Sequence, residues 1–85
     1  MLVAKRLKQD ISIGVNLKKY RTRLGLSQEI VAAKLQVRGL DISRSIISQM
    51  ELGIYSVRVS VLLTLSEIYQ VPVQSFFEDL ERHEL

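Results

Sequence analysis

An apolar residue directly followed by serine occurs at two places that suit the start of a helix, and this repeated pattern constrains the fold more than any other feature. In Leu26–Ser27 and in Ile42–Ser43, the serine hydroxyl can cap the first helical turn. The apolar residue can pack one turn further on, against Val31 in the first case and Ile47 in the second, as a hydrophobic staple. Two short helices with closely similar beginnings are therefore predicted.

The segments around these two helices also have helical spacing. Ser12 is the expected cap of a first helix ending at Gly25, whose apolar stripe is Ile13, Leu17, Tyr20 and Leu24. The second helix is expected to bury Val31, Ala32 and Leu35, and the third to end at Gly53. Gln36–Ile42 connects these two helices, and Gly39 gives this connection a residue free to adopt positive φ.

The last third of the chain contains conflicting signals. Val57–Val61 alternates apolar and polar residues like a strand, but residues 59–69 continue with helical spacing at Val59, Leu62, Ser66 and Tyr69. Because a single strand would have no partner, we predict a fourth helix here. It is apolar nearly all round, so it should be the central and most buried one. Pro72 ends it and can open a short fifth helix, with apolar residues at Val73, Phe76, Phe77 and Leu80.

Composition predicts one cytoplasmic domain. Eighty-five residues can bury a modest core, there is no cysteine, and no apolar stretch approaches the roughly 20 residues of a membrane span. Residues 1–25 contain seven basic residues against Asp10, whereas residues 59–85 contain five acidic residues against Arg82. This asymmetry suggests a polyanionic partner for the front half, but from charge alone solvated surface charge is the favoured explanation.

The third predicted helix has an unusual polar side. Arg44, Ser45, Ser48 and Gln49 lie there, where a solvated helix would usually carry Glu and Lys. Arg can bond guanine and Gln adenine through two hydrogen bonds, and serines allow close approach, so this side suits a DNA groove. Ile46 beside it could contact a thymine methyl group or help seal the core. The alternative is a polar face turned to water.

Three segments together resemble the phage-repressor (Cro-like, or xenobiotic-response-element) helix-turn-helix family: LGLSQEIVAAKL, ISRSIISQMELG and LLTLSEIYQVPVQSFF. The resemblance covers about residues 12–78. It implies an all-α fold, a compact five-helix bundle of the lambda-repressor-like type, spanning residues 12–80 between a basic arm (1–11) and an acidic tail (81–85). In this family the second helix of the motif lies in the major groove of double-stranded DNA and the first crosses the backbone.

The resemblance also assigns roles to individual residues. Ser27 and Gln28 match the phosphate-binding start of the second helix, and Ser43 stands at the matching start of the third. The family's base-contacting positions correspond to Arg44, Ser45, Ser48 and Gln49. Arg21 and Glu51 match a structural salt bridge. No cofactor or metal is implied.

The chain departs from the family pattern in two places. Leu52 replaces the polar residue of the usual Glu-Asn-Gly sequence. The turn between the second and third helices is also about five residues longer than usual, by Val37–Asp41. These extra residues could change the angle of the third helix, or Arg38 could contact a phosphate. A harmless insertion is slightly favoured, because lengthening a loop costs little free energy.

The sequence therefore predicts a sequence-specific DNA-binding transcriptional regulator, of the repressor type, and no enzyme. His83 is the only histidine and has no carboxylate at a metal-binding spacing. The family resemblance implies a homodimer on a pseudo-palindromic operator, with half-sites about 34 Å apart. Phe77 and Leu80 are candidates for the dimer interface, or for core packing. The alternative function is a protein-interaction module of the same fold, antitoxin-like or a regulator's partner, with little DNA specificity of its own.

Overall fold

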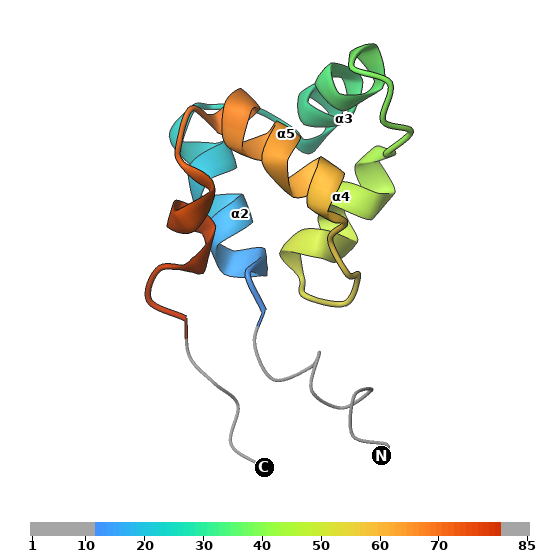
Figure 1. The fold of residues 1–85 in the computed structure, drawn as a ribbon. Helices are drawn as coiled ribbons and strands as arrows, with labels where there is room; N and C mark the ends of the chain where they lie inside the picture. The colour runs from blue at the N-terminus through green and yellow to red at the C-terminus, as the bar shows by residue number, and fades with distance from the viewer. Residues whose placement is uncertain (1–11, 81–85) are drawn as a thin grey trace.

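The computed structural model describes residues 12–80, and these residues contain four α-helices and one 3-10 helix. In chain order they are α2 (Gly14–Arg23), α3 (Gln28–Val37), α4 (Arg44–Glu51), α5 (Val59–Tyr69) and the 3-10 helix η1 (Val73–Phe77) (Figure 1). The predicted all-α fold is confirmed for this part of the chain. The predicted arm (1–11) and tail (81–85) lie outside the described residues.

The starts of α3 and α4 follow the capping pattern. Ser27 and Ser43 both have extended backbone angles directly before their helices. The Oγ of Ser27 accepts a hydrogen bond from the Ile30 N–H at 3.1 Å, and the Oγ of Ser43 accepts one from the Ile46 N–H at 3.3 Å. Each hydroxyl satisfies a backbone donor that the helix itself cannot satisfy, so both predicted caps are confirmed.

The start and end of α2 differ slightly from the prediction. The helix begins at Gly14, and Ser12 lies two residues before it, where its Oγ accepts a hydrogen bond from the Gly14 N–H at 3.0 Å. At the other end, Leu24 follows the last helical residue and is exposed, so its predicted place in the apolar stripe is wrong. Gly25 has a φ of +70° and completes the predicted stop.

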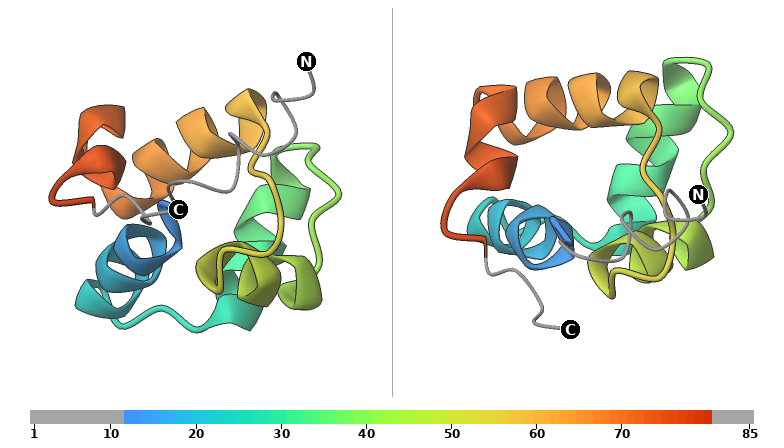
Figure 2. Two further views of the ribbon diagram at one scale, coloured as in Figure 1. Left: turned by 90° about the horizontal axis from the view of Figure 1, so that it is seen from below. Right: turned by 60° about the horizontal axis from the view of Figure 1, so that its bottom comes forward.

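The five elements surround one apolar core (Figure 2). Helix α3 packs on α4 and α5, α2 packs on α4 and η1, and η1 also contacts α5. The buried apolar side chains come from every element: Leu17, Tyr20, Val31, Ala32, Leu35, Ile42, Ile47, Met50, Val61, Leu65, Ile68, Tyr69 and Phe76. Leu26 packs at the edge of this core, next to the start of α3. The core contains Val31, Ala32 and Leu35, so the predicted inward side of α3 is confirmed.

Helix α5 has the predicted bounds, but it is not buried on all sides. Its core side is formed by Val61, Leu65 and Ile68, at spacings of four and three residues. On the outer side, Val59 is 69% exposed and Leu63 is 51% exposed. The expectation of a central, most buried helix is wrong, because α5 lies across one side of the core and, among residues 12–80, only its inner side has neighbouring elements.

The predicted fifth helix is a 3-10 helix of five residues, η1. Pro72, with a φ of −66°, precedes it. Phe76 is fully buried and meets Tyr20 and Tyr69 edge-on, each at a ring-centroid distance of 6.1 Å. An edge-on arrangement is favourable for aromatic pairs, so Phe76 anchors this short element to α2 and α5.

Asn16 and Tyr20 of α2 hold the end of η1 in place. The Nδ2 group of Asn16 donates to the backbone oxygens of Phe76 at 2.9 Å and Glu78 at 2.8 Å. The Tyr20 hydroxyl donates to Oε1 of Glu78 at 2.6 Å. Asn16 is buried, and both of its amide hydrogens are used. These bonds join residues about 60 positions apart in the chain.

The connection between α3 and α4 is ordered by local bonds. Gly39 has a φ of +85°, as predicted, and the Leu40 N–H returns to the Leu35 oxygen at 3.0 Å, which closes the end of α3. Ile42 is buried in the core. The greater length of this connection relative to the family stays a prediction.

Candidate nucleic-acid interface

Helix α4 divides into a buried side and an outer side. Ile47, Met50 and Glu51 form the buried side. The four predicted base-contacting residues lie away from it: Arg44 and Ser45 are exposed, and Ser48 and Gln49 are half-buried. None of these four side chains is acidic, so a negatively charged partner meets no repulsion from them.

Leu52 continues the outer side of α4. It follows the last residue of α4, three and four residues after Gln49 and Ser48, and is 71% exposed. Residues at these spacings share one side of a helix, so an apolar group follows the polar ones there. Ile46 is half-buried and packs against the core, which agrees with its sealing role.

The residues predicted to contact the DNA backbone lie at helix ends. Ser27 and Ser43 use their oxygens as caps, and their hydroxyl hydrogens can be donated elsewhere. Arg38 follows α3, where its Nη1 donates to the Lys34 oxygen at 3.1 Å. Its guanidinium has further N–H groups, so this bond leaves donors for a phosphate.

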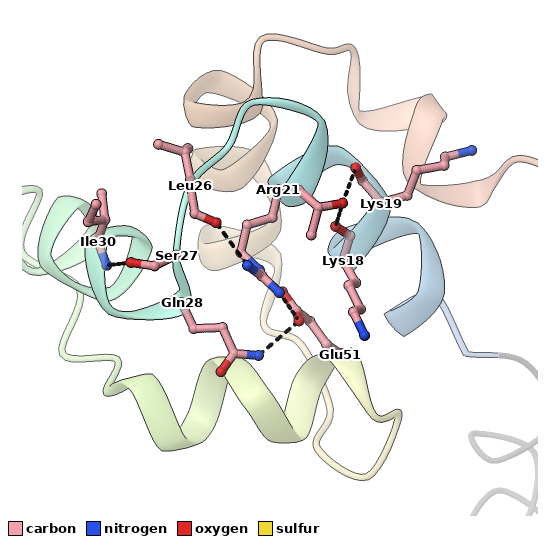
Figure 3. A network of polar contacts seen from close by, with 9 residues as sticks. Lys18, Lys19, Arg21, Leu26, Ser27, Gln28, Ile30 and Glu51 are labelled. Carbon is pink, nitrogen blue, oxygen red and sulfur yellow. Dashed lines mark hydrogen bonds and ion pairs between the residues drawn. The ribbon is translucent and has the colours of Figure 1, made fainter.

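A buried ion pair joins the end of α4 to α2. Arg21 donates from Nε to Oε2 of Glu51 at 2.6 Å and from Nη2 to Oε1 at 2.9 Å (Figure 3). A third bond runs from Arg21 Nη1 to the Leu26 oxygen at 2.8 Å. Both residues are only 8% exposed. The paired geometry and the further bond satisfy the buried charges, so this pair fixes the position of α4 against α2.

Gln28 joins the same carboxylate, a contact that sequence reasoning missed. Its Nε2 group donates to Oε1 of Glu51 at 3.0 Å, so Glu51 connects α2, α3 and α4 (Figure 3). The amide has a second N–H, which can be donated to a phosphate while the first stays on Glu51. No local sequence pattern indicates this contact, because the two residues are 23 positions apart and meet only in the folded chain.

A hydrogen bond and burial in this region shift two pKa values. The hydrogen bond to Glu51 raises the pKa of Arg21. Burial raises the pKa of Tyr69 well above its ordinary value of 10, and the nearby negative charge of Glu51 adds to the effect. At neutral pH, Arg21 is therefore a cation and Tyr69 a neutral phenol.

Gly14 provides the close approach between α2 and α4, which sequence reasoning also missed. A methyl group on Gly14 would lie 2.7 Å from the Met50 oxygen and closer still to the Glu51 oxygen. The start of α2 therefore lies directly against the carbonyl end of α4. In the sequence, Gly14 could have been noticed as a glycine where helix formers are preferred.

Phe77 and Leu80, the candidates for a dimer interface, differ in exposure. Phe77 is half-exposed at the end of η1, whereas Leu80 is half-buried. Within residues 12–80 there is no cluster of metal-binding side chains, and no helix is long and apolar enough to cross a membrane.

Comparison with known proteins agrees with this geometry. Residues 17–76 match the helix-turn-helix family model. Two uncharacterized HTH-type transcriptional regulators, from Sinorhizobium medicae (strain WSM419) and Rhizobium meliloti (strain 1021), are each 39% identical over 70 residues. These alignments cover 82% of this chain, which spans about half, 47%, of each relative's length.

A solved structure is similar as well. The crystal structure of the DNA-binding domain of BldD matches with a TM-score of 0.64 and 32% identity, over 80% of this chain and 92% of that one. The family consists of DNA-binding regulators and not of enzymes, which confirms that part of the prediction. The chain belongs to the Cro/C1-type helix-turn-helix family of DNA-binding domains.

Proposed function

We propose that residues 12–80 bind double-stranded DNA in a sequence-specific manner, with α4 as the recognition helix in the major groove. One observation carries this proposal: the outer side of α4 presents a guanidinium, two hydroxyls and an amide, while its only carboxylate is buried against Arg21. These groups are the donors and acceptors that distinguish base pairs in the major groove. Arg44 and Gln49 supply two-bond contacts to bases, and Ser45 and Ser48 allow close approach.

The starts of α3 and α4 supply the contacts to phosphates. Ser27, Gln28 and Ser43 lie at the N-terminal ends of α3 and α4. Free backbone N–H groups at such helix ends can bind anions such as phosphate. Gln28 is held by Glu51, so its remaining N–H is oriented before DNA binds and little side-chain entropy is lost. Arg38, which follows the other end of α3, adds a positive charge. The basic arm (1–11) and the acidic tail (81–85) flank this domain in the proposal.

The protein acts, in this proposal, as a cytoplasmic transcriptional repressor that binds a pseudo-palindromic operator as a homodimer. The support is the family: two relatives are called HTH-type transcriptional regulators, and family members with known geometry bind half-sites about 34 Å apart.

Selection of bound sequences from a random duplex library, at a fixed ionic strength, tests the proposal. Arg44→Ala and Gln49→Ala should each cost about 1–3 kcal/mol on the selected sequence and should relax its sequence preference. Gln28→Ala should weaken binding to all sequences alike. Gln74→Ala, in η1, is the matched control and should leave binding unchanged. If none of the substitutions on α4 alters binding, α4 is not the recognition helix.

A protein-interaction module is the second candidate, because Ile54 and Val59 are strongly exposed apolar residues near α4. A protein that binds DNA phosphates releases cations condensed on the DNA, so its affinity must fall as the salt concentration rises. A wild-type protein without any salt-dependent DNA affinity would therefore favour this second function.

A further inference from the structure

The backbone at the end of α4 fixes the position of Leu52. Its φ of −83° and ψ of −6° are helical, and its N–H donates to the Ser48 oxygen at 3.0 Å, so it continues the helix by one residue. The N–H groups of Gly53 and Ile54 also bond to oxygens of α4, at 3.1 Å and 3.0 Å, which closes the helix end. Gly53, with a φ of +80°, then turns the chain toward α5 (Figure 1). Leu52 is thus the last residue whose side chain follows the geometry of α4.

Helical geometry places Leu52 in the middle of the outer side of α4. Successive residues of a helix are rotated by about 100°, so Leu52 lies about 20° from Ser45 and within about 60° of both Ser48 and Gln49. The fully buried apolar side chains of α4 lie about 140° or more away from it. Leu52 therefore shares the side that carries the predicted base-contacting residues.

The surroundings of Leu52 leave its side chain free for a contact outside the domain. Side chains of an α-helix lean toward its N-terminus, so the leucine is directed over the turn that contains Ser48 and Gln49. Leu52 is 71% exposed, and within residues 12–80 it belongs neither to the core nor to the half-buried apolar residues that pack against it. Packing within the described domain therefore does not account for an apolar residue at this position.

An apolar side chain in the major groove has a chemically matched target in thymine. The C5-methyl group of thymine lies in this groove, whereas the other bases present mainly hydrogen-bond donors and acceptors there. We propose that Leu52 contacts the C5-methyl group of a thymine and thereby selects a T·A base pair in the operator. This inference rests on the proposed function, because it requires α4 to lie in the major groove.

The rise of the helix predicts where this thymine lies. Leu52 follows Gln49 by about 4.5 Å along the helix axis, at 1.5 Å per residue. Successive base pairs are about 3.4 Å apart. The selected T·A pair should therefore be the base pair that Gln49 contacts or the one next to it.

Deoxyuridine tests the proposal at a single chemical group, because it differs from thymidine only by the missing C5-methyl group. The wild-type chain first selects its sequence from a random duplex library at a fixed ionic strength. Each thymine of the selected half-site is then replaced by deoxyuridine in turn, and the affinity is measured. Burial of one methyl group is worth about fourfold in affinity, so binding should weaken by about fourfold at one thymine position.

Variants of Leu52 show whether this side chain is responsible. Leu52→Ala and Leu52→Asn should each bind the thymine and deoxyuridine duplexes equally at that position, whereas Leu52→Met should still prefer thymine. Leu63→Ala is the matched control, because it shortens a leucine that is 51% exposed on the outer side of α5, and it should retain the fourfold difference. Thermal unfolding should give all of these variants a Tm close to that of the wild type, since both leucines are exposed.

Two results would overturn this inference. One is a selected site in which no thymine can be replaced by deoxyuridine with a loss of affinity, and the other is a loss that persists in Leu52→Ala. In either case, a selected sequence that depends on Arg44 and Gln49 would still support the proposed function. A wild type that selects no sequence at all would overturn the proposed function and this inference with it.

Discussion

Replacing Gly14 by alanine should destabilise the domain, although alanine is the better helix former. The new methyl group would meet the backbone oxygens of Met50 and Glu51 at the end of α4. Ordinary van der Waals contact begins at 3.4 Å, so the methyl carbon and the Met50 oxygen, 2.7 Å apart, must move about 0.7 Å away from each other. Overpacking costs about 1–3 kcal/mol, and rigid backbone atoms place this case at about 3. Alanine in place of glycine gains at most about 1 kcal/mol of helix propensity, the value for a helix interior, so a loss of about 2 kcal/mol remains.

Thermal unfolding measures this loss directly. For a domain of this size, 2 kcal/mol lowers Tm by about 8–16 °C. Val15→Ala is the neighbouring control, 74% exposed on α2, and should change stability by less than about 0.5 kcal/mol. Because the displaced carbonyls belong to α4, Gly14→Ala should also weaken specific DNA binding, measured at a temperature where the variant is folded. A variant more stable than the wild type would refute this account of the α2–α4 contact.

Three further predictions test the energetics of the fold. Arg21→Met should cost about 3–5 kcal/mol in denaturant unfolding, since it leaves the Glu51 charge buried and unpaired; the double variant with Glu51→Leu should cost less than the sum of the two single ones. Burial raises the pKa of Tyr69 in the folded state. The stabilisation of the folded state that goes with this shift is therefore complete below pH 10 and is lost as the pH rises toward the folded pKa. Tyr69→Phe should therefore remove a decline of about 1.4 kcal/mol per pH unit above pH 10, whereas Tyr55→Phe should retain it. Ser43→Ala should cost about 1 kcal/mol in unfolding free energy and Ser43→Gly only a few tenths, as expected for loss of a helix cap.

Features set by a few adjacent residues could be predicted from the sequence. Ser27 and Ser43 cap their helices because a serine hydroxyl reaches its own next turn, whatever the rest of the fold does. The bounds of α5 follow in the same way from apolar spacing and from Pro72 beyond it. Positive φ at Gly39 follows from the missing side chain.

Features that depend on neighbouring elements could not be predicted this way. Val59 and Leu63 look like core residues, yet within the described part of the chain, residues 12–80, no element covers the outer side of α5. In the candidate site, the positions on α4 could be predicted because helical spacing separates them from Ile47 and Met50. The bond from Gln28 to Glu51 could not, since it depends on where α3 and α4 cross.

The bonds from Asn16 to the end of η1 have a consequence for the order of folding. They close a loop of about 60 residues, so we expect them to form after α3, α4 and α5 have brought the two ends of the domain together. Local helical contacts form quickly, whereas contacts between distant residues carry the entropy cost of loop closure. Joining the ends of the domain by a short linker and opening the chain in the α3–α4 connection would make these contacts local. Such a circular permutant should fold faster than the natural order of elements while keeping the same core.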